Sequence, residues 1–303
     1  MKLFSGSANK SLTERVASAL NIKVSPLEIH VFPDKEKRVR VIDKVLDENT
    51  VVIQPTNTLA SENYMELFFI VDALKRSGAK SIIAVIPYLG YQRQDHIFRT
   101  GEAVSLEVII KILDMIGVDK IIVFDLHSIK IQELFHIPIA HLSALKIFAE
   151  KIKQEKWNKN DTVLVSPDMG GIRRIKLLSS MLDNMPYATI EKNRDLETGK
   201  VCVTGSEGLN DFKRAIIVDD MISSGGTIAV ASEFLAKRGA KEIYVFATHP
   251  VFSKEAKGIL RESKALKVFV TDTIQIPEDK KFAKLQILSV ASMIAKELKA
   301  TNH

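Results

Sequence analysis

The sequence predicts an α/β protein made of two doubly wound parallel-sheet domains. Short apolar segments alternate with longer amphipathic segments along the 303 residues, as expected for strands joined by crossover helices. One arrangement occurs three times, at residues 78–85, 117–124 and 239–246. In each, a glycine that ends a helix precedes a short polar segment and an apolar strand. Because the arrangement lies on both sides of residue 145, we expect two domains related by duplication.

The composition is that of a soluble globular protein. Hydrophobic residues make up 46% of the chain, which is enough for substantial cores. The segment after Met1 has no apolar core long enough for a secretory signal, and no later apolar run approaches a membrane span. We therefore expect a cytoplasmic protein that does not bind membranes. The single cysteine cannot form an internal disulfide.

The charge distribution favours small anionic substrates over nucleic acid. The formal net charge is +6, which accommodates anionic ligands. The lysines are spread along the chain, however, and there is neither a long basic block nor a basic patch interleaved with aromatic residues. The sequence therefore predicts no nucleic-acid partner.

The elements of the first half follow from periodicity and capping signals. Ser11 and Glu14 have the spacing of a capping box and open an amphipathic helix that ends near residue 20. Period-two alternation over residues 28–45 is interrupted at residues 32–36, which we interpret as a hairpin tip because Pro and Asp favour turns. The other expected elements are strands at 2–5, 51–55, 82–86 and 121–124, a helix capped by Asn63 and a helix from about Ala103.

The second half repeats the alternation of strands and helices. A helix over residues 143–156 is followed by polar residues that mark the entrance to the second domain. The later elements are expected as strands at 162–166, 187–190, 216–218, 244–249 and 268–272, a helix from about Thr227 to Lys237 and a final helix over 282–298.

Residues 216–228 are the stretch around which the candidate site is organised. An apolar strand leads into two acids, two serines, two glycines and a helix start, namely Asp219, Asp220, Ser223, Ser224, Gly225, Gly226 and Thr227. Glycines can adopt positive φ and turn backbone N–H groups inward, and the helix N-terminus adds further donors, so the loop suits a phosphate. The paired acids indicate ribose hydroxyls, a cation or positive charge developing on a sugar carbon. The predicted ligand is a sugar phosphate, although acids and Gly-Gly pairs also occur in ordinary strand-to-helix turns.

The segment Val218 to Thr227 resembles the ribose-phosphate loop of the type I phosphoribosyltransferase fold. From Phe4 to Ile274 the chain is similar to the ribose-phosphate pyrophosphokinase family, the phosphoribosyl pyrophosphate synthetases. The resemblance implies an N-terminal nucleotide-binding domain at residues 1–144 and a C-terminal ribose-phosphate-binding domain at 145–280. It also implies that a C-terminal helix within residues 281–303 packs back on the first domain.

Two segments of the first domain are implied to bind ATP. The hairpin tip resembles the family's Phe-Pro-Asp-Gly-Glu loop, and Lys35 stands where the family usually has glycine. The loop after the 82–86 strand matches the family's Tyr-x-Arg-Gln-Asp, at the sheet edge where doubly wound folds collect ligand contacts. The implied ATP-binding residues are Phe32, Asp34, Lys35, Glu36, Arg93, Gln94 and Asp95. From the residues alone, a turn without function and a solvated arginine are also consistent with these segments.

The resemblance also implies metal-binding and catalytic residues. His127 ends a strand in an Asp-Leu-His motif that contacts Mg²⁺ in the family, although Mg²⁺ prefers oxygen ligands. Asp168 is implied as a second metal-site residue, while by its position it is also a typical helix N-cap. Lys192 and Arg194 leave the same face of an extended segment and resemble the family's mobile catalytic pair, which closes over phosphates.

For the second domain, the implied ribose 5-phosphate ligands include Arg194 and the loop after the 216–218 strand. The loop residues are Asp219, Asp220, Ser223, Ser224, Gly225, Gly226 and Thr227. Ser223 and Ser224 replace the family's commoner Asp-Thr pair, and serine keeps hydroxyl donors for phosphate.

The family's reaction is ribose-phosphate diphosphokinase activity with Mg²⁺ as cofactor. It transfers the diphosphoryl group of ATP to ribose 5-phosphate, and gives phosphoribosyl pyrophosphate and AMP. The resemblance further implies a homo-oligomer with a dimer as the minimal unit, since the family's hairpin reaches the ATP site of a neighbouring subunit. Two alternatives stay open. A salvage phosphoribosyltransferase would not need the motifs at Phe32 and Arg93, and a non-catalytic regulatory paralogue would be expected to lose Lys192 and Arg194.

Overall fold

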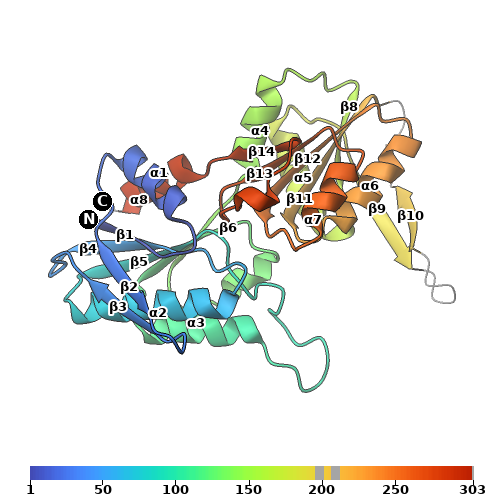
Figure 1. Ribbon diagram of the computed structural model, residues 1–303. Helices are drawn as coiled ribbons and strands as arrows, with labels where there is room; N and C mark the ends of the chain where they lie inside the picture. The colour runs from blue at the N-terminus through green and yellow to red at the C-terminus, as the bar shows by residue number, and fades with distance from the viewer. Residues whose placement is uncertain (195–200, 206–211, 302–303) are drawn as a thin grey trace. The chain divides into compact units, whose positions relative to one another are not determined.

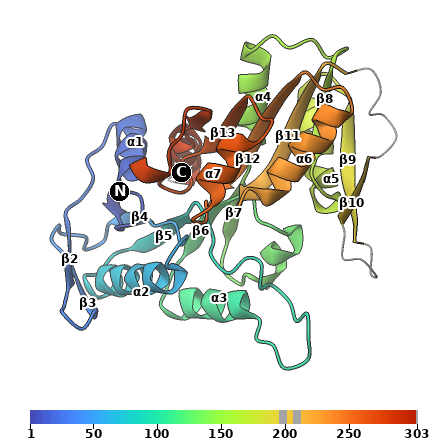
Figure 2. The same ribbon diagram turned by 45° about the vertical axis from the view of Figure 1, so that its right-hand side comes forward.

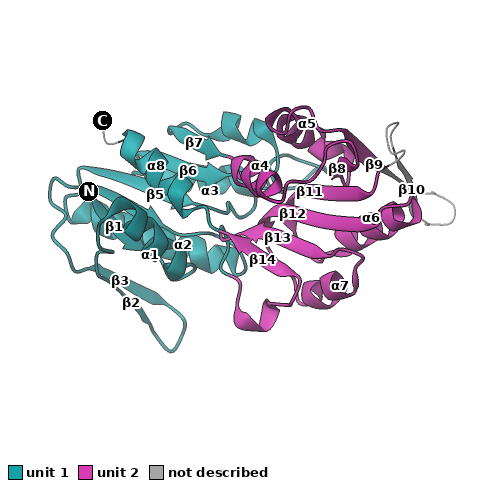
Figure 3. Ribbon diagram, turned by 90° about the horizontal axis from the view of Figure 1, so that it is seen from above, with its two compact units in different colours: residues 1–142, 273–275, 289–303 teal, residues 143–272, 276–288 magenta. Residues whose placement is uncertain are grey.

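The computed structural model describes residues 1–194, 201–205 and 212–301, with the backbone alone for residues 191–194 and 201–205. The chain forms two compact units (Figure 3). Unit 1 consists of residues 1–142, 273–275 and 289–303, and unit 2 of residues 143–272 and 276–288. Each unit has a sheet of mainly parallel strands with helices packed on it, so the predicted α/β fold class is confirmed.

The main sheet in the described part of unit 1 has five parallel strands. Their order across the sheet is β1 (Lys2–Ser5), β4 (Asn49–Ile53), β5 (Ser81–Ile86), β6 (Lys120–Phe124) and β7 (Ile139–Leu142). On the other side of β1, Val24 forms a single parallel bridge to Leu3. The chain therefore leaves β1 toward Val24 and then adds the later strands of this sheet on the opposite side of β1. The direction in which strands are added to the sheet thus reverses between β1 and β4.

Helices cover both faces of this sheet (Figures 1 and 2). The helices α2 (Ala60–Arg76) and α3 (Ser105–Met115) pack on the face that carries Phe4 and Val52. Leu3 and Val51, which alternate with these residues and are also buried, point to the other face. There α1 (Lys10–Leu20) and α8 (Ala291–Thr301) pack against each other. A 3₁₀ helix, η1 (Ile129–Leu134), links β6 to β7.

The predicted hairpin is a separate two-stranded sheet in unit 1. Strands β2 (Leu27–Val31) and β3 (Lys37–Val41) pair antiparallel, and Val31 lies opposite Lys37. This register leaves residues 32–36 as the tip, as predicted. Leu27, Val39 and Val41 pack against the unit 1 core, so the end of the hairpin far from the tip is held by apolar contacts.

The sheet of unit 2 also reverses its direction of strand addition. Its order is β10 (Val201–Gly205), β9 (Tyr187–Arg194), β8 (Thr162–Ser166), β11 (Arg214–Ile222), β12 (Glu242–Pro250), β13 (Lys267–Thr271) and β14 (Leu285–Leu288). Only β10 is antiparallel to its neighbour among these described strands. The chain builds outward from β8 to β10, then adds β11 on the other side of β8.

In the described part of unit 2, two helices pack on each face of the sheet. The helices α4 (Leu145–Gln154) and α5 (Ile172–Met181) lie over the face with Leu164 and Ile216. The helices α6 (Gly226–Lys237) and α7 (Ala256–Glu262) lie over the face with Val163 and Ile217. Short 3₁₀ turns occur at η2 (Met169–Gly171) and η3 (Glu278–Lys280).

Three predicted helix starts are wrong. The cap of α1 is Asn9, whose side chain accepts a hydrogen bond from Leu12 N at 3.2 Å, so Ser11 and Glu14 do not open the helix. Asn63 lies inside α2, where its Nδ2 donates to Thr58 O at 3.2 Å.

The third error concerns the C-terminal helix, which begins later than predicted. The predicted helix within 281–303 is helical only from Ala291 in the described chain, because residues 285–288 form β14 at the edge of the unit 2 sheet. The helix that does form packs in unit 1, while β14 belongs to unit 2.

The three repeated glycines end helices as predicted. Gly78, Gly117 and Gly239 have φ of 82°, 91° and 98°, in the left-handed region that an L side chain adopts at a cost. Around Gly239 an added Cβ would meet no atom within 4 Å, so only the backbone conformation requires glycine there.

We predict opposite stability effects for two glycine-to-alanine changes in unit 2. Gly239→Ala should lower the free energy of unfolding by about 1 kcal/mol, the cost of a left-handed alanine. Gly258, inside α7, also has open space around its Cβ position but no positive φ. Gly258→Ala should therefore raise the free energy of unfolding by about 0.5 kcal/mol. Urea denaturation of both variants measures the difference, and equal effects would contradict the backbone explanation.

Candidate active site

The candidate site of unit 2 lies where the strand order reverses. Doubly wound sheets bind ligands at the carboxyl ends of the two strands that flank such a reversal. Here those strands are β8, which is followed by Asp168, and β11, which carries Asp219 and Asp220 near its end. The topology thus brings together acids that are about 50 positions apart in the sequence.

Sequence analysis missed a cation beside these acids. Arg174 of α5 lies 3.6 Å from Asp219, between Nη1 and Oδ1, and 3.7 Å from Asp220, between Nη2 and Oδ2. Burial raises the pKa of Asp219, the neighbouring Asp220 and Asp168 raise it further, and Arg174 opposes them. Arg174 thus pairs with two carboxylates while Asp168 adds a further negative charge that acts on Asp219, and this excess of acids suits a cation or hydroxyl donors.

The loop after β11 has one of the two predicted positive-φ glycines. Gly225 has φ of 83°, whereas Gly226 begins α6 without a positive φ, so the prediction for Gly226 is wrong. A Cβ on Gly225 would lie 3.1 Å from Leu260 Cγ, so close packing against α7 also favours glycine. Gly226 N donates to Ser224 Oγ at 3.3 Å, and Ser224 is exposed. The helix starts beside Thr227 as predicted.

Asp168 is a helix cap in this structure. Its Oδ1 accepts a hydrogen bond from Gly171 N at 3.2 Å, which confirms the capping interpretation. The residue is exposed, and the cap uses one carboxylate oxygen. Asp168 is therefore fixed at the end of β8 while its carboxylate still faces solvent.

Lys192 and Arg194 lie on β9, which extends further than predicted. The backbone is extended over both residues, and this part of β9 pairs with β10. Their side-chain positions lie outside what the structure describes.

In unit 1, the loops after β5 and β6 are joined by side chains that the sequence did not single out. Gln92 is buried, and its Oε1 accepts a hydrogen bond from His127 N at 2.9 Å. His141 of β7 accepts one from Leu126 N through Nε2 at 3.1 Å, and its burial lowers its pKa, against the opposing effect of Asp125. Gln92 from the loop after β5 and His141 from β7 thus hold the backbone at and just before His127, while the His127 side chain is exposed.

Arg93, Gln94 and Asp95 lie in the loop after β5. Arg93 and Gln94 are exposed, and Asp95 is half-buried with Oδ1 2.6 Å from His96 Nδ1. The loop is tied back to α3, because Leu106 N donates to Gln94 O at 3.2 Å. These three residues therefore share one ordered loop at the carboxyl end of β5.

The hairpin tip has an ordered turn with all four predicted residues at its surface. Lys35 N donates to Phe32 O at 2.9 Å, and Glu36 N donates to Asp34 Oδ1 at 3.2 Å. Lys35 has φ of 75°, so this lysine adopts the left-handed conformation that glycine would adopt more easily. The Phe32 ring is 36% exposed and packs edge-on against His30 at a centroid distance of 4.7 Å.

Two absences among the described residues bear on possible ligands. No three His, Cys, Asp or Glu side chains there converge as they would in a metal site formed by protein ligands alone. None of the helices described in the structure combines the length and apolar composition of a membrane span.

Comparison with known proteins relates both units to one family. The chain matches the family model for the N-terminal domain of ribose phosphate pyrophosphokinase over residues 1–117, and the phosphoribosyl transferase domain over residues 131–284. It is 38% identical over 295 residues to the ribose-phosphate pyrophosphokinase of Fusobacterium nucleatum, covering 97% of this chain and 93% of that protein. The enzyme of the same name from Gloeobacter violaceus is 37% identical over 298 residues, 98% of this chain and 89% of that protein.

A solved structure is similar over almost the whole chain. The phosphoribosylpyrophosphate synthetase of Mycobacterium smegmatis superposes with a TM-score of 0.93 at 34% identity, and the match covers 99% of this chain and 98% of that one.

We predict that Asp219→Asn stabilises the folded protein. Because the pKa of Asp219 is raised in the folded state, folding stability falls as pH rises through that pKa, and the cost is fully present above it. Asparagine keeps an acceptor for Asp220 N, which now donates to Asp219 Oδ1 at 2.8 Å, but carries no charge. At pH 8 we expect Tm to rise by about 2–4 °C, and the gain to shrink as the pH is lowered.

The matched control is Asp279→Asn, an exposed acid in the same unit. It should leave Tm unchanged at both pH values. A decrease in Tm for Asp219→Asn at pH 8 would contradict the charge repulsion described above.

Proposed function

This chain belongs to the ribose-phosphate pyrophosphokinase family, and we propose that its two units contribute separate sets of side chains to that family's reaction. The reaction transfers the diphosphoryl group of ATP to the C1 hydroxyl of ribose 5-phosphate. The C1 oxygen bonds to the β-phosphorus, the bond from that phosphorus to the α-phosphate oxygen breaks, and the hydroxyl proton is released. The products are phosphoribosyl pyrophosphate and AMP.

Unit 2 would bind ribose 5-phosphate. Asp219 and Asp220 are suited to accept hydrogen bonds from ribose hydroxyls, because Arg174 compensates their charge only in part. The loop that follows offers the serine and threonine hydroxyls and the first N–H groups of α6 to the 5-phosphate, through Ser223, Ser224, Gly225, Gly226 and Thr227. Arg194 would reach the same substrate from β9.

Unit 1 would bind ATP. The exposed ring of Phe32 offers a face to the adenine, and the acceptors of Asp34 and Glu36 lie in the same turn as Lys35. The exposed Arg93, beside Gln94 and Asp95, is suited to the triphosphate, because a guanidinium binds phosphate oxygens in a bidentate manner.

Catalysis would rest on alignment and on neutralising phosphate charge, as phosphoryl transfer requires. Lys192 and Arg194 would offset the charge of the transferred group, with Lys192 as a compact point charge and Arg194 as a planar fork.

Mg²⁺ is the proposed cofactor, and the donors present fit it. Mg²⁺ is commonly held by one or two protein groups together with substrate phosphates, so a site without three converging ligands among the described side chains suits this ion. Asp168, whose carboxylate is exposed at the end of β8, and His127, exposed after β6, would be the protein ligands. Bound there, the ion would offset charge on the phosphate oxygens.

The observation that carries this proposal is the similarity over nearly the whole chain, which includes both units. A salvage phosphoribosyltransferase would account for unit 2 alone and leaves the match of residues 1–117 to a pyrophosphokinase domain unexplained. A non-catalytic paralogue is disfavoured because Lys192 and Arg194 are both retained. We further propose a cytoplasmic location and a dimer as the minimal working unit.

The first prediction of this proposal is the identity of the products. Protein incubated with ribose 5-phosphate, ATP and Mg²⁺ should release AMP and phosphoribosyl pyrophosphate in equal amounts, measured by anion-exchange chromatography. Adding EDTA should stop the reaction, and excess Mg²⁺ should restore it. Formation of ADP in place of AMP, or the absence of turnover, would refute the assignment.

The dimer predicts complementation between two inactive variants. If the hairpin of one subunit serves the ATP site of the other, a dimer of Phe32→Ala with Lys192→Ala has one site with both defects and one with neither. Freely exchanging equal mixtures should then recover roughly a quarter of wild-type activity, since half the dimers are mixed and each has one intact site.

The control is a mixture of Phe32→Ala with the double variant Phe32→Ala/Lys192→Ala, in which no site is intact. Mass spectrometry of labelled subunits establishes exchange independently of activity. Exchange without recovery would mean that the hairpin serves the ATP site of its own subunit.

A further inference from the structure

Unit 1 has its own point of strand reversal, between β1 and β4, and the chain's own side chains fill it. Gly6 directly follows β1, and Gln54 directly follows β4. A Cβ on Gly6 would lie 2.1 Å from Gln54 Oε1, so the side chain of Gln54 occupies the space beside the glycine. In unit 2 the equivalent edge carries acids whose charge Arg174 compensates only in part, whereas here the polar groups satisfy one another.

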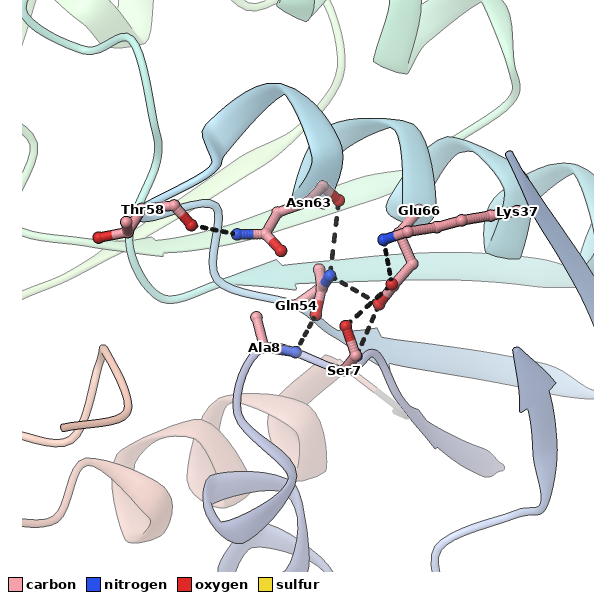
Figure 4. A network of polar contacts seen from close by, with 7 residues as sticks. All are labelled: Ser7, Ala8, Lys37, Gln54, Thr58, Asn63 and Glu66. Carbon is pink, nitrogen blue, oxygen red and sulfur yellow. Dashed lines mark hydrogen bonds and ion pairs between the residues drawn. The ribbon is translucent and has the colours of Figure 1, made fainter. Parts of the chain in front are cut away.

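The centre of this arrangement is Glu66, a buried carboxylate of α2 (Figure 4). Its Oε1 accepts hydrogen bonds from Ser7 N at 2.6 Å and Gln54 Nε2 at 3.0 Å. Its Oε2 accepts from Ser7 Oγ at 2.8 Å and Lys37 Nζ at 2.7 Å. Gln54 Oε1 in turn accepts from Ala8 N at 3.1 Å. The carboxylate is thus surrounded by donors in the way that a bound anion would be.

Lys37 is the one participant in this network that comes from the hairpin (Figure 4). It is the first residue of β3 and directly follows the tip. The side chains of Lys37 and Glu66 are 15% and 1% exposed, so the ion pair is largely screened from water. The apolar contacts of Leu27, Val39 and Val41 hold the other end of the hairpin, and Lys37 is the polar contact nearest the tip.

The ion pair is maintained in its charged form. Burial by itself would raise the pKa of Glu66, but hydrogen bonds from Lys37 and Ser7 outweigh it and lower the pKa. Removing one partner of such a pair leaves a charge in a site that water reaches poorly, which is strongly unfavourable. The two strands of the hairpin therefore gain a fixed angle to α2 that a two-stranded ribbon would not maintain alone.

We propose that Lys37 and Glu66 are positioning residues. Glu66 occupies the reversal point of unit 1 as a bound ligand would, and its ion pair with Lys37 holds the hairpin tip in place to bind ATP. The proposal rests on the proposed function only in naming ATP as the ligand of the tip. The anchoring itself concerns the hairpin and α2.

Kinetics of Lys37→Met and Glu66→Gln test the positioning role. Each variant should raise KM for ATP at least about fivefold while KM for ribose 5-phosphate changes less than about twofold. The double variant should raise KM for ATP no more than either single one, because each change removes the same contact. The matched control is Arg76→Met, which removes an exposed ion pair with Asp72 on the same helix and should leave both constants unchanged.

Hydrogen exchange tests the anchor independently of activity. The amides of Phe32 and Lys35 each donate a backbone hydrogen bond across the tip. They should exchange at least about fivefold faster in Lys37→Met than in the wild type. Should Lys37→Met fail to fold, Glu66→Gln, which keeps side-chain shape, provides the same comparison.

The outcomes separate the two proposals. Unchanged exchange at the tip, or equal increases in both KM values, would overturn the positioning role. If the wild-type protein released no AMP, the proposed function would fail, and the exchange experiment would still decide whether Lys37 and Glu66 anchor the hairpin.

Discussion

The reversal of strand order is the constraint on which both units depend. Parallel strands joined by right-handed crossovers place all their carboxyl ends at one edge of the sheet. Where the chain changes its direction of strand addition, the loops after the two flanking strands diverge to opposite faces, and side chains distant in sequence can meet. In unit 2 this happens between β8 and β11, and in unit 1 between β1 and β4, where Val24 supplies the reversing bridge.

The acidic side chains at the two reversal points are compensated in contrasting ways. In unit 2, burial and the neighbouring Asp220 and Asp168 raise the pKa of Asp219, so the folded chain carries a local cost that a ligand or cation can relieve. In unit 1, Glu66 has four protein donors and its pKa is lowered, so the same edge is satisfied without a ligand. The proposed roles of the two reversal points therefore differ: ligand binding in unit 2 and rigidity in unit 1.

Sequence analysis succeeded where chemistry is local. The three helix-ending glycines and the hairpin tip lie in short contiguous segments, and periodicity and turn signals identify them. Arg174, Gln92 and His141 were missed because each acts on a residue brought near only by tertiary folding. A signal for Arg174 existed, since it lies in the first turn of the helix after the Asp168 turn. Residues 285–288 were misassigned because a short edge strand has too few positions for its period to differ from a helix.

Unit 1 is built from separate stretches of the chain, and this has a consequence for the synthesis of the protein. The helix α8, residues 291–301, packs on α1, and the apolar side chains of Leu12 and Val16 on α1 are fully buried in the finished unit. At about 5–20 residues per second, roughly 7–30 s pass between completion of β7 and the appearance of α8. During that interval all of unit 2, which ends at residue 288, is synthesised and can fold, while unit 1 still lacks part of its cover. The first unit to emerge from the ribosome is thus the last to be completed, and until then the apolar face of α1 lacks the cover that α8 provides.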